Sequence, residues 1–494
     1  MSNGLSDLFG PTFLAKIQTS LSELPRDREG GFSYDRLDMS VSSTQVEAFS
    51  KLASAIADAL VANKSLLEPF GPKAGCTLTA TLSESCISEL TKNLYVRITS
   101  RPISTDVTSL LSETYNSTVG NSDEKLANML AVLFQLPEVY FQDLTGTDDV
   151  NFQMAGELAR LAWNSFPDAS LLQRASAGEL RSPTVLRSEI ERVMEDQKAR
   201  RAIRTFSEQW LSLYQVKDFS YSSDFLSGQV ANAALRLAMI NEILDFIEYI
   251  VFDQKGSYSD LLTSSLARVE NVDLAKIYNV TASPNWQKLP NRTGLLTRAG
   301  LLATGKNEPH TIFRGVRITR EILCNDIPNP PPSAIDMRPT GIVRTNYSNR
   351  EYTDIRTSGT SCMGCHSKIN PLAHSLGGFD GIGRLVTVDR VFDEVGRFAR
   401  QFPVDSTSRA IIDGDEVSIA GHNQLASLIA ASRQAPKCLS TQLVRYYAGR
   451  HEASTDTCGI EQAGLKLNAH SPIVNVVTQW IEDELTALQP KGVQ

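Results

Sequence analysis

Hydrophobic residues recur at three- and four-residue steps over four long stretches of the chain. This spacing places apolar side chains on one face of a helix, so it predicts helices over residues 44–65, 124–142, 188–216 and 231–252. The tryptophan, methionine and phenylalanine side chains on these stripes are expected to form a core. They are not expected to form a cofactor site.

The pattern changes in the second half of the chain. A run of prolines at Ile327–Pro332 predicts an extended segment. Beyond it, residues 385–421 are rich in valine, isoleucine and phenylalanine, and Ile411–Asp415 carries the Asp-Gly pair of a tight hairpin turn. Helical spacing returns over residues 423–488. We therefore predict a mainly α protein of several helical domains with a small β-hairpin element.

The length of the chain sets the expected number of domains. A chain of 494 residues is long enough for several cores. We predict an N-terminal helical domain over 1–100 and a central helical domain over 101–285. A cysteine-containing region follows over 286–385, and a C-terminal domain, a hairpin and then helices, spans 386–494.

Net charge and hydropathy argue against nucleic-acid binding and against a membrane-spanning segment. The formal net charge is −8, so there is no basic excess for binding nucleic acid. No run of about 18 uncharged apolar residues occurs, which predicts no membrane span. The first twenty residues lack the pattern of a signal peptide, so either a leader has been removed or the chain is cytosolic.

One short segment carries specific chemistry. Cys362-Met363-Gly364-Cys365-His366 has the C-x-x-C-H spacing of covalent haem attachment. Two thiols at this spacing can add to the vinyl groups on one haem edge, and the histidine after them is placed to bind the iron as its proximal ligand. The motif predicts one covalently attached haem c in a cytochrome c-like region over 286–385.

Two other kinds of site use paired cysteines. A thioredoxin-like redox pair would follow a strand and begin a helix, whereas the residues before the motif, Thr357–Ser361, are typical of a loop. A structural zinc site would need a second pair of ligands, and the chain has no second C-x-x-C. Haem attachment therefore fits the sequence best.

The remaining cysteines bear on the compartment. Haem is attached outside the cytoplasm, where conditions are oxidising and disulfides form. Cys76 and Cys86 lie ten residues apart, Cys438 and Cys458 lie twenty apart, and both spacings suit local disulfides. Free, buried thiols in a reduced protein are the alternative. Cys324 is left over, and we expect a buried thiol there.

Several segments along the chain carry a family resemblance. In order they are Phe152–Pro167, Phe206–Leu211, Asn291–Leu296, Arg314–Gly315 with Ile322–Pro332, Cys362–Arg384 and Cys438–Arg450. Together they resemble the multi-domain cytochrome c-like proteins of planctomycetes, myxobacteria and other proteobacteria, whose domains have no assigned function. The resemblance covers nearly the whole chain, and its most specific part is the haem region.

The resemblance implies a secreted, haem-bearing protein, but it implies no particular reaction. It also supports Cys76–Cys86 and Cys438–Cys458 as disulfides. The chain departs from the family at two places. The family's N-terminal domain usually begins further upstream than Leu5–Gly10. Relatives also often carry a histidine shortly before the motif, where this chain has Asp354–Thr357, so no distal ligand is expected from that position.

The second axial ligand of the iron has several candidates. No methionine follows Met363, so a methionine ligand would come from upstream, and Met337 is the best placed. The candidate histidines are His310, His374, His422, His451 and His470. An open or water-ligated position is the third alternative. Asp380 and Arg384 would either contact the haem propionates or form a structural salt bridge.

Three functions fit a mono-haem protein of this size. The first is an extracytoplasmic c-type cytochrome, periplasmic or at the cell surface, that exchanges electrons with a partner protein or a small-molecule donor or acceptor. The second is a haem-c-dependent oxidoreductase, peroxidase- or oxygenase-like, with an open distal site. The third is a cell-surface binding or assembly protein with a structural or relay haem. We take electron transfer as the expectation.

Overall fold

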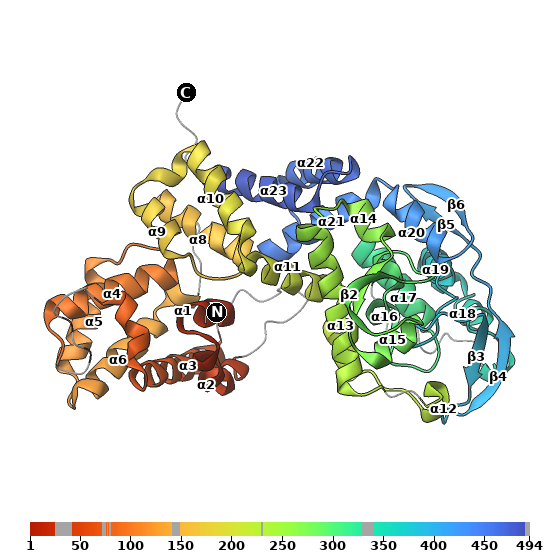
Figure 1. Ribbon diagram of the computed structural model, residues 1–494, viewed down its shortest axis with the longest axis horizontal. Coiled ribbons are helices and arrows are strands. Elements are labelled where there is room, and N and C mark those ends of the chain that lie inside the picture. Colours follow the sequence, from red (N-terminus) through yellow and green to blue (C-terminus); the bar gives the residue numbers. More distant parts are fainter. Residues whose placement is uncertain are drawn as a thin grey trace. The chain divides into compact units, whose positions relative to one another are not determined.

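The chain splits into two compact units (Figure 1). The computed structural model describes residues 1–24, 42–71, 76, 78, 81–140, 149–228, 231–328 and 340–489. The first unit comprises Met1–Arg28, Arg36–Ala202 and Thr478–Gln494, and the second is formed mainly by Ile203–Val477. The finer division into four domains stays a prediction.

The first unit is built from helices. They are α1 (Ser2–Phe9), α2 (Pro11–Ser22), α3 (Ser43–Val61), α4 (Glu84–Thr99), α5 (Thr105–Ser117), α6 (Ser122–Gln135), α7 (Pro137–Tyr140), α8 (Val150–Trp163), α9 (Ala169–Ser176) and α10 (Pro183–Glu195). Helix α11 (Gln197–Trp210) and helix α23 (Ile473–Ala487) contain the positions at which the chain passes from one unit to the other.

Helix α3 shows why these residues fold as they do. It starts with a capping box in which Ser42 and Gln45 bond each other's backbone N–H groups. Its apolar stripe, which includes Leu52, Ile56 and Leu60, is fully buried. This stripe packs along α6 and joins the apolar core of the unit. The helix predicted over 44–65 is confirmed as α3, which ends at Val61. The helix predicted over 124–142 is α6 followed by α7, with a break at Leu136, and residues 141 and 142 lie outside the described ones.

The second unit combines helices with small antiparallel sheets. Its helices are α12 (Ser223–Leu226), α13 (Ala233–Glu248), α14 (Tyr258–Thr263), α15 (Val272–Tyr278), α16 (Ala299–Leu302), α17 (Thr311–Arg317), α18 (Asn349–Arg356), α19 (Thr360–His374), α20 (His422–Ala430), α21 (Gln434–Ala448) and α22 (Thr457–Asn468). Its strands are β1 (Leu266–Val269), β2 (Ser283–Lys288), β3 (Val388–Phe392), β4 (Phe398–Pro403), β5 (Ser408–Ile412) and β6 (Asp415–Ile419).

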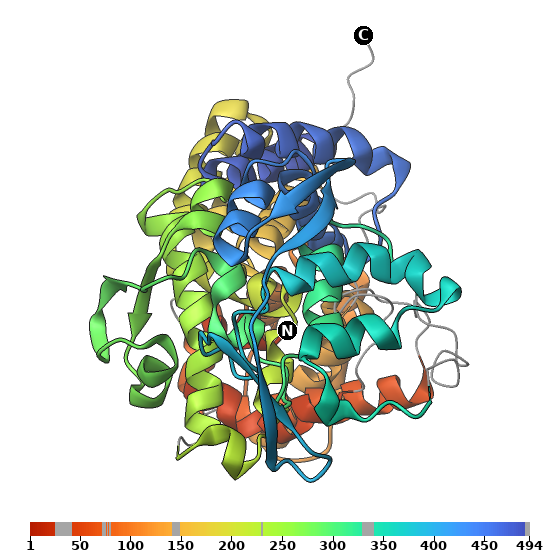
Figure 2. The same ribbon diagram turned by 90° about the vertical axis from the view of Figure 1, so that its right-hand side faces the viewer.

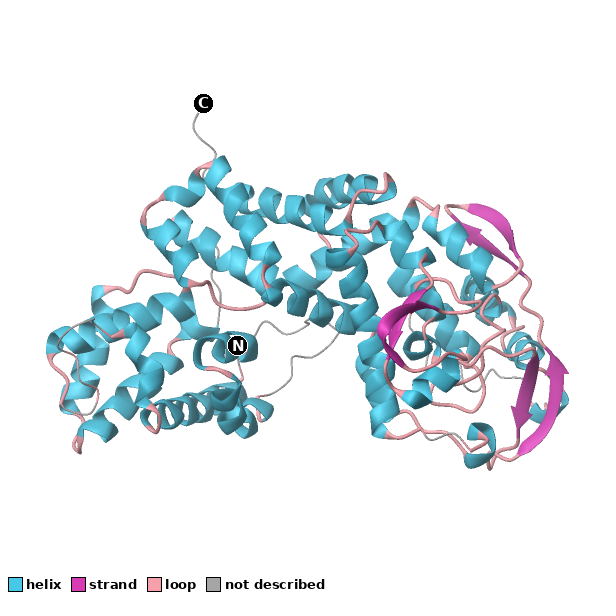
Figure 3. Ribbon diagram, viewed as in Figure 1, coloured by secondary structure: helices cyan, strands magenta, loops and turns pink. Residues whose placement is uncertain are grey.

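Within the described residues the strands form three separate two-stranded pairs, β1–β2, β3–β4 and β5–β6 (Figure 3). The turn between β5 and β6 holds Asp413 at φ 55° and Gly414 at φ 91°, the two positive values that a tight two-residue hairpin requires. The hairpin predicted at Ile411–Asp415 is therefore confirmed, and so is the mainly α fold with a small β element.

The interior of the second unit contains buried charges. Arg298 and Glu242 form an ion pair at 2.6 Å, and their side chains are 1% and 2% exposed. Tyr278 donates to the other oxygen of Glu242 at 2.7 Å, and Arg298 also donates to the carbonyl of Leu266. These hydrogen bonds offset the cost of removing the two charged groups from water.

Candidate functional site

The C-x-x-C-H motif lies at the start of α19, a helix that follows α18 almost directly. α18 begins with a capping box between Ser348 and Glu351. Gly359 then caps α19, which starts at Thr360, so the loop before the motif ends two residues earlier than Thr357–Ser361 predicted. Because a helix and not a strand precedes the motif, the arrangement of a thioredoxin-like pair is not formed.

The three motif residues share one face of α19, since Cys365 and His366 follow Cys362 by three and four residues. Cys362 and Cys365 are partly exposed and are not joined in a disulfide. Met363, between them, is 42% exposed, and no atom lies within 4 Å of the place that a Cβ would take at Gly364. The turn between the two cysteines is therefore open to solvent, and both thiols are free.

A close contact with α17 fixes the position of α19. A Cβ on Gly315 would lie 2.4 Å from the carbonyl oxygen of Ile369, so only glycine allows the two helices to approach this far. The neighbouring Arg314 donates to the carbonyls of Leu302 and Phe379, at 2.8 and 2.7 Å. Burial lowers the pKa of this guanidinium to about 10, and it stays charged at neutral pH. The pair Arg314–Gly315 therefore anchors the helix that carries the motif, which also packs against β5 (Figure 2).

His366 is held by a hydrogen-bonded group of side chains. Its Nδ1 lies 3.0 Å from Oδ1 of Asn370, one helical turn further on. The amide nitrogen of Asn370 donates to Thr357 at 2.9 Å and to Asp354 at 3.3 Å. Sequence reasoning missed Asn370 and Asp354. The i, i+4 spacing of His366 and Asn370 was the available signal, because it places both on one helical face.

Asp354 also binds the last residue of α19. Nε2 of His374 lies 2.9 Å from the same carboxylate oxygen that accepts from Asn370. Burial alone would raise the pKa of Asp354, but the hydrogen bond and charge of His374, the hydrogen bond of Asn370 and the charge of Arg350 lower it below its usual value. The carboxyl group is therefore an anion over the physiological range.

A cleft opens beside Asp354 and His374. Its volume is about 380 Å³, and its walls come from α18, the end of α19 and the strands β3 and β4. Arg350 and Asp405 line it as an ion pair at 2.8 Å. The side-chain group that begins at His366 therefore ends at a solvent-accessible cleft.

Asp380 and Arg384 form the structural salt bridge, at 2.6 Å. Asp380 also accepts from the backbone N–H groups of Ile382 and Arg384, which closes the turn after α19. Arg384 lies over the ring of Phe225 and donates to its carbonyl. These contacts buttress the turn.

The candidates for the second axial ligand differ in their surroundings. Met337 lies outside the described residues. Nε2 of His374 is bonded to Asp354, and Nε2 of His422 lies 2.9 Å from the carbonyl of Asn291. Nδ1 of His310 accepts the Phe313 N–H at the start of α17.

The two remaining candidates are His451 and His470. His451 follows α21, and His470 follows α22 with a left-handed φ of 57°.

The first unit contains the disulfide Cys76–Cys86, as expected. Cys86 lies in the first turn of α4 and is buried in the apolar core. This bond closes a local loop with a sequence separation of ten residues.

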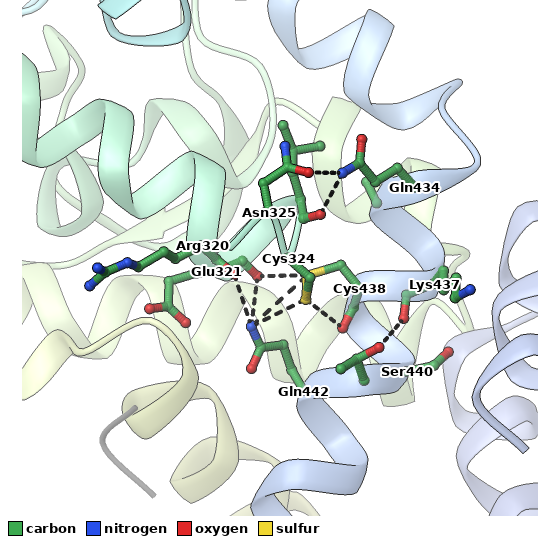
Figure 4. Close-up of a disulfide and its surroundings, with 12 residues drawn as sticks. Arg320, Glu321, Cys324, Asn325, Gln434, Lys437, Cys438, Ser440 and Gln442 are labelled. Carbon is green, nitrogen blue, oxygen red and sulfur yellow. Dashed lines mark hydrogen bonds between the residues drawn. A yellow bond between two sulfur atoms is a disulfide. The ribbon is translucent and has the colours of Figure 1, made fainter. Parts of the chain in front are cut away.

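The expected disulfide Cys438–Cys458 is wrong, because Cys438 is joined to Cys324 (Figure 4). A π-helical turn, Ile318–Ile322, places Cys324 against α21, with 5.2 Å between the two Cα atoms. Cys458 is a free, exposed thiol at the start of α22. The prediction relied on short spacing, whereas the true partner is 114 residues away.

Within the described residues, no group of three or more histidine, cysteine, aspartate or glutamate side chains could hold a metal ion. None of the helices in the same ranges combines the length and apolar character needed to cross a membrane.

Two family models match the chain. Residues 150–280 match PSD4, described as a protein of unknown function (DUF1592), and residues 292–389 match PSCyt3, described as a protein of unknown function (DUF1588). The second match includes all of α18 and α19. Neither a curated protein nor a solved structure matches the chain.

Proposed function

Since the chain carries two domains of the planctomycete-type cytochrome c-like family, we propose that it is an extracytoplasmic, mono-haem c-type cytochrome that acts in electron transfer. Cys362 and Cys365 would hold the haem through thioether bonds, and His366 would bind its iron. One observation carries the proposal. Two unpaired thiols lie one turn apart on a partly exposed helical face, and a histidine follows directly.

The chain's own residues suit such a role. When bound, the haem supplies a one-electron redox centre. The exposed turn at Met363 and Gly364 leaves this side of the site accessible to a redox partner. The second half of α19 is anchored by buried residues such as Ile369 and Asn370, so the ligand is held on a rigid element.

The cysteines support an extracytoplasmic location. Cys76–Cys86 and Cys324–Cys438 are disulfides of a kind that persists in oxidising compartments and is rare in the cytoplasm. Covalent haem attachment takes place in the same compartments. Both features support the periplasm or the cell surface as the place of action.

A second candidate function is a haem-c-dependent oxidoreductase with an open distal position. The observation that favours it is the engagement of Nε2 of His374 by Asp354 and of Nε2 of His422 by the Asn291 carbonyl. A histidine that already holds another partner is a poor second ligand, and an open position allows small molecules to reach the iron.

The test is to mature the chain in a bacterial periplasm with a cytochrome c assembly system and record the spectrum of the dithionite-reduced protein. We expect haem that stays bound to the denatured chain, and a c-type spectrum of the native protein. It should be lost in Cys365→Ala and His366→Ala and retained in Cys458→Ala, which removes an exposed thiol outside the site. A full c-type spectrum in Cys365→Ala would contradict the attachment.

Carbon monoxide separates the two candidate functions. An unchanged spectrum after its addition means a strong second ligand and supports electron transfer. A prompt shift of the Soret band means an open or weakly held position and favours the oxidoreductase.

A further inference from the structure

We propose that Asp354 is a positioning residue that, acting through Asn370, keeps the ring proton of His366 on Nδ1 and leaves Nε2 to bind iron. The inference rests on the proposed haem site, because it assigns the residues that prepare the iron ligand. It follows from the order in which donors and acceptors are arranged along one chain of side chains.

Asp354 sets which groups donate and which accept in this chain of hydrogen bonds. An ionised carboxylate has only acceptors, so the amide group of Asn370 must face it with its NH2 end. The second N–H of that amide donates to Oγ1 of Thr357 at 2.9 Å. The hydroxyl of Thr357 donates its own proton to the carbonyl of Thr353 at 2.8 Å, so its oxygen is the acceptor in the bond from Asn370. Both partners therefore require the same orientation of the amide.

The oriented amide determines the tautomer of the ring. Its oxygen, Oδ1, faces Nδ1 of His366 at 3.0 Å and can only accept. Nδ1 must then carry the proton, which leaves the lone pair of the neutral ring on Nε2. A metal-binding histidine needs this arrangement, and the group that accepts its other N–H makes it a stronger ligand.

The charge of Asp354 enters the site through the same bonds. Asn370, the middle of the link, is 5% exposed, whereas the side chain of Asp354 is 48% exposed at the cleft. In the buried part of the link, hydrogen-bonded groups polarise one another. Electron density pushed toward the ring favours ferric over ferrous iron. Asp405 lies in the same cleft as Asp354 but bonds Arg350 and Thr407 and does not bond Asn370, so it serves as a matched control for charge alone.

The first experiment needs no haem. Nitrogen NMR of the haem-free full chain reports which ring nitrogen of His366 carries the proton. We expect Nδ1–H in the native chain and loss of that preference in Asn370→Ala. Retention of Nδ1–H in Asn370→Ala overturns the proposal. Because haem is absent, failure to attach haem does not affect this result.

The second experiment measures the ferric–ferrous equilibrium of the haem-bound protein at fixed potential. We expect Asp354→Asn to move the ratio toward ferrous by about threefold to tenfold, where tenfold corresponds to about 59 mV for one electron. A shift in Asp405→Asn as large as that in Asp354→Asn means that only overall charge acts and overturns the assignment. If the native chain takes up no covalent haem, the proposed function fails, while the NMR result still decides the tautomer.

Discussion

In the first unit, α3 and α6 pack along each other through apolar side chains, and the disulfide joins cysteines ten residues apart. In the second unit, buried guanidinium groups bridge distant segments. Arg298 meets Glu242 over 56 residues of sequence, Arg314 meets the carbonyl of Phe379 over 65, and the disulfide spans 114. The two units differ in the regularity of the backbone that they bury. Regular helices satisfy their own carbonyls, whereas the irregular segments of the second unit need side-chain donors.

The two disulfides give the largest expected contrast. In the chain-entropy model, replacing both Cys324 and Cys438 by alanine lowers the free energy of unfolding by about 5 kcal/mol, because that bond closes a long loop. Replacing Cys76 and Cys86 lowers it by about 3 kcal/mol. Cys458→Ala should leave it unchanged. Guanidinium denaturation of the oxidised chains measures all three, and equal losses for the two pairs would break the comparison.

Removal of the buried counter-charge is expected to rank next. Glu242→Gln leaves the Arg298 cation buried without its anion and should cost about 3–5 kcal/mol of stability. Glu270→Gln removes a carboxylate that is 63% exposed beside Arg268, and should change the stability by less than about 0.5 kcal/mol. Thermal unfolding of the two variants side by side is the measurement. A loss below about 1 kcal/mol for Glu242→Gln would mean that the second unit does not depend on its buried charges.

Glycine replacements give the smallest expected effect. Gly315→Ala places a Cβ against the backbone carbonyl of Ile369, so α17 and α19 must separate, at a cost of about 1–2 kcal/mol. Gly459→Ala, in α22 with open space around it, should instead stabilise the chain by about 0.5–1 kcal/mol through helix propensity. Urea denaturation measures the change in stability of both variants. A stabilising Gly315→Ala would show that the contact between α17 and α19 is not tight.

The elements that local patterns specify were predicted from the sequence. The apolar stripe with Leu52 and Ile56 marks α3, and Asp413–Gly414 marks the β5–β6 turn, because each signal lies within a few residues. The pairing of Cys324 with Cys438 was missed, since a contact between residues 114 apart leaves no mark on either neighbourhood.

The candidate site also has one part that the local sequence predicts and one part that it does not. Cys362, Cys365 and His366 are adjacent in sequence, so their spacing alone predicts the chemistry. The support from Asp354 comes from the preceding helix, and only the packing of α18 against α19 reveals it. Asp354 bonds Asn370, which in turn contacts the candidate iron ligand His366.

The bond between Cys324 and Cys438 encloses the whole of α18, α19 and both C-terminal hairpins in a covalent ring. A single protease cut anywhere between residues 325 and 437 would open this ring without separating the chain into two molecules. A peptide carrying the C-x-x-C-H motif would leave only after reduction of the disulfide or a second cut. On a denaturing gel, a nicked but unreduced chain would therefore migrate as one band, and a reducing agent would release the fragment.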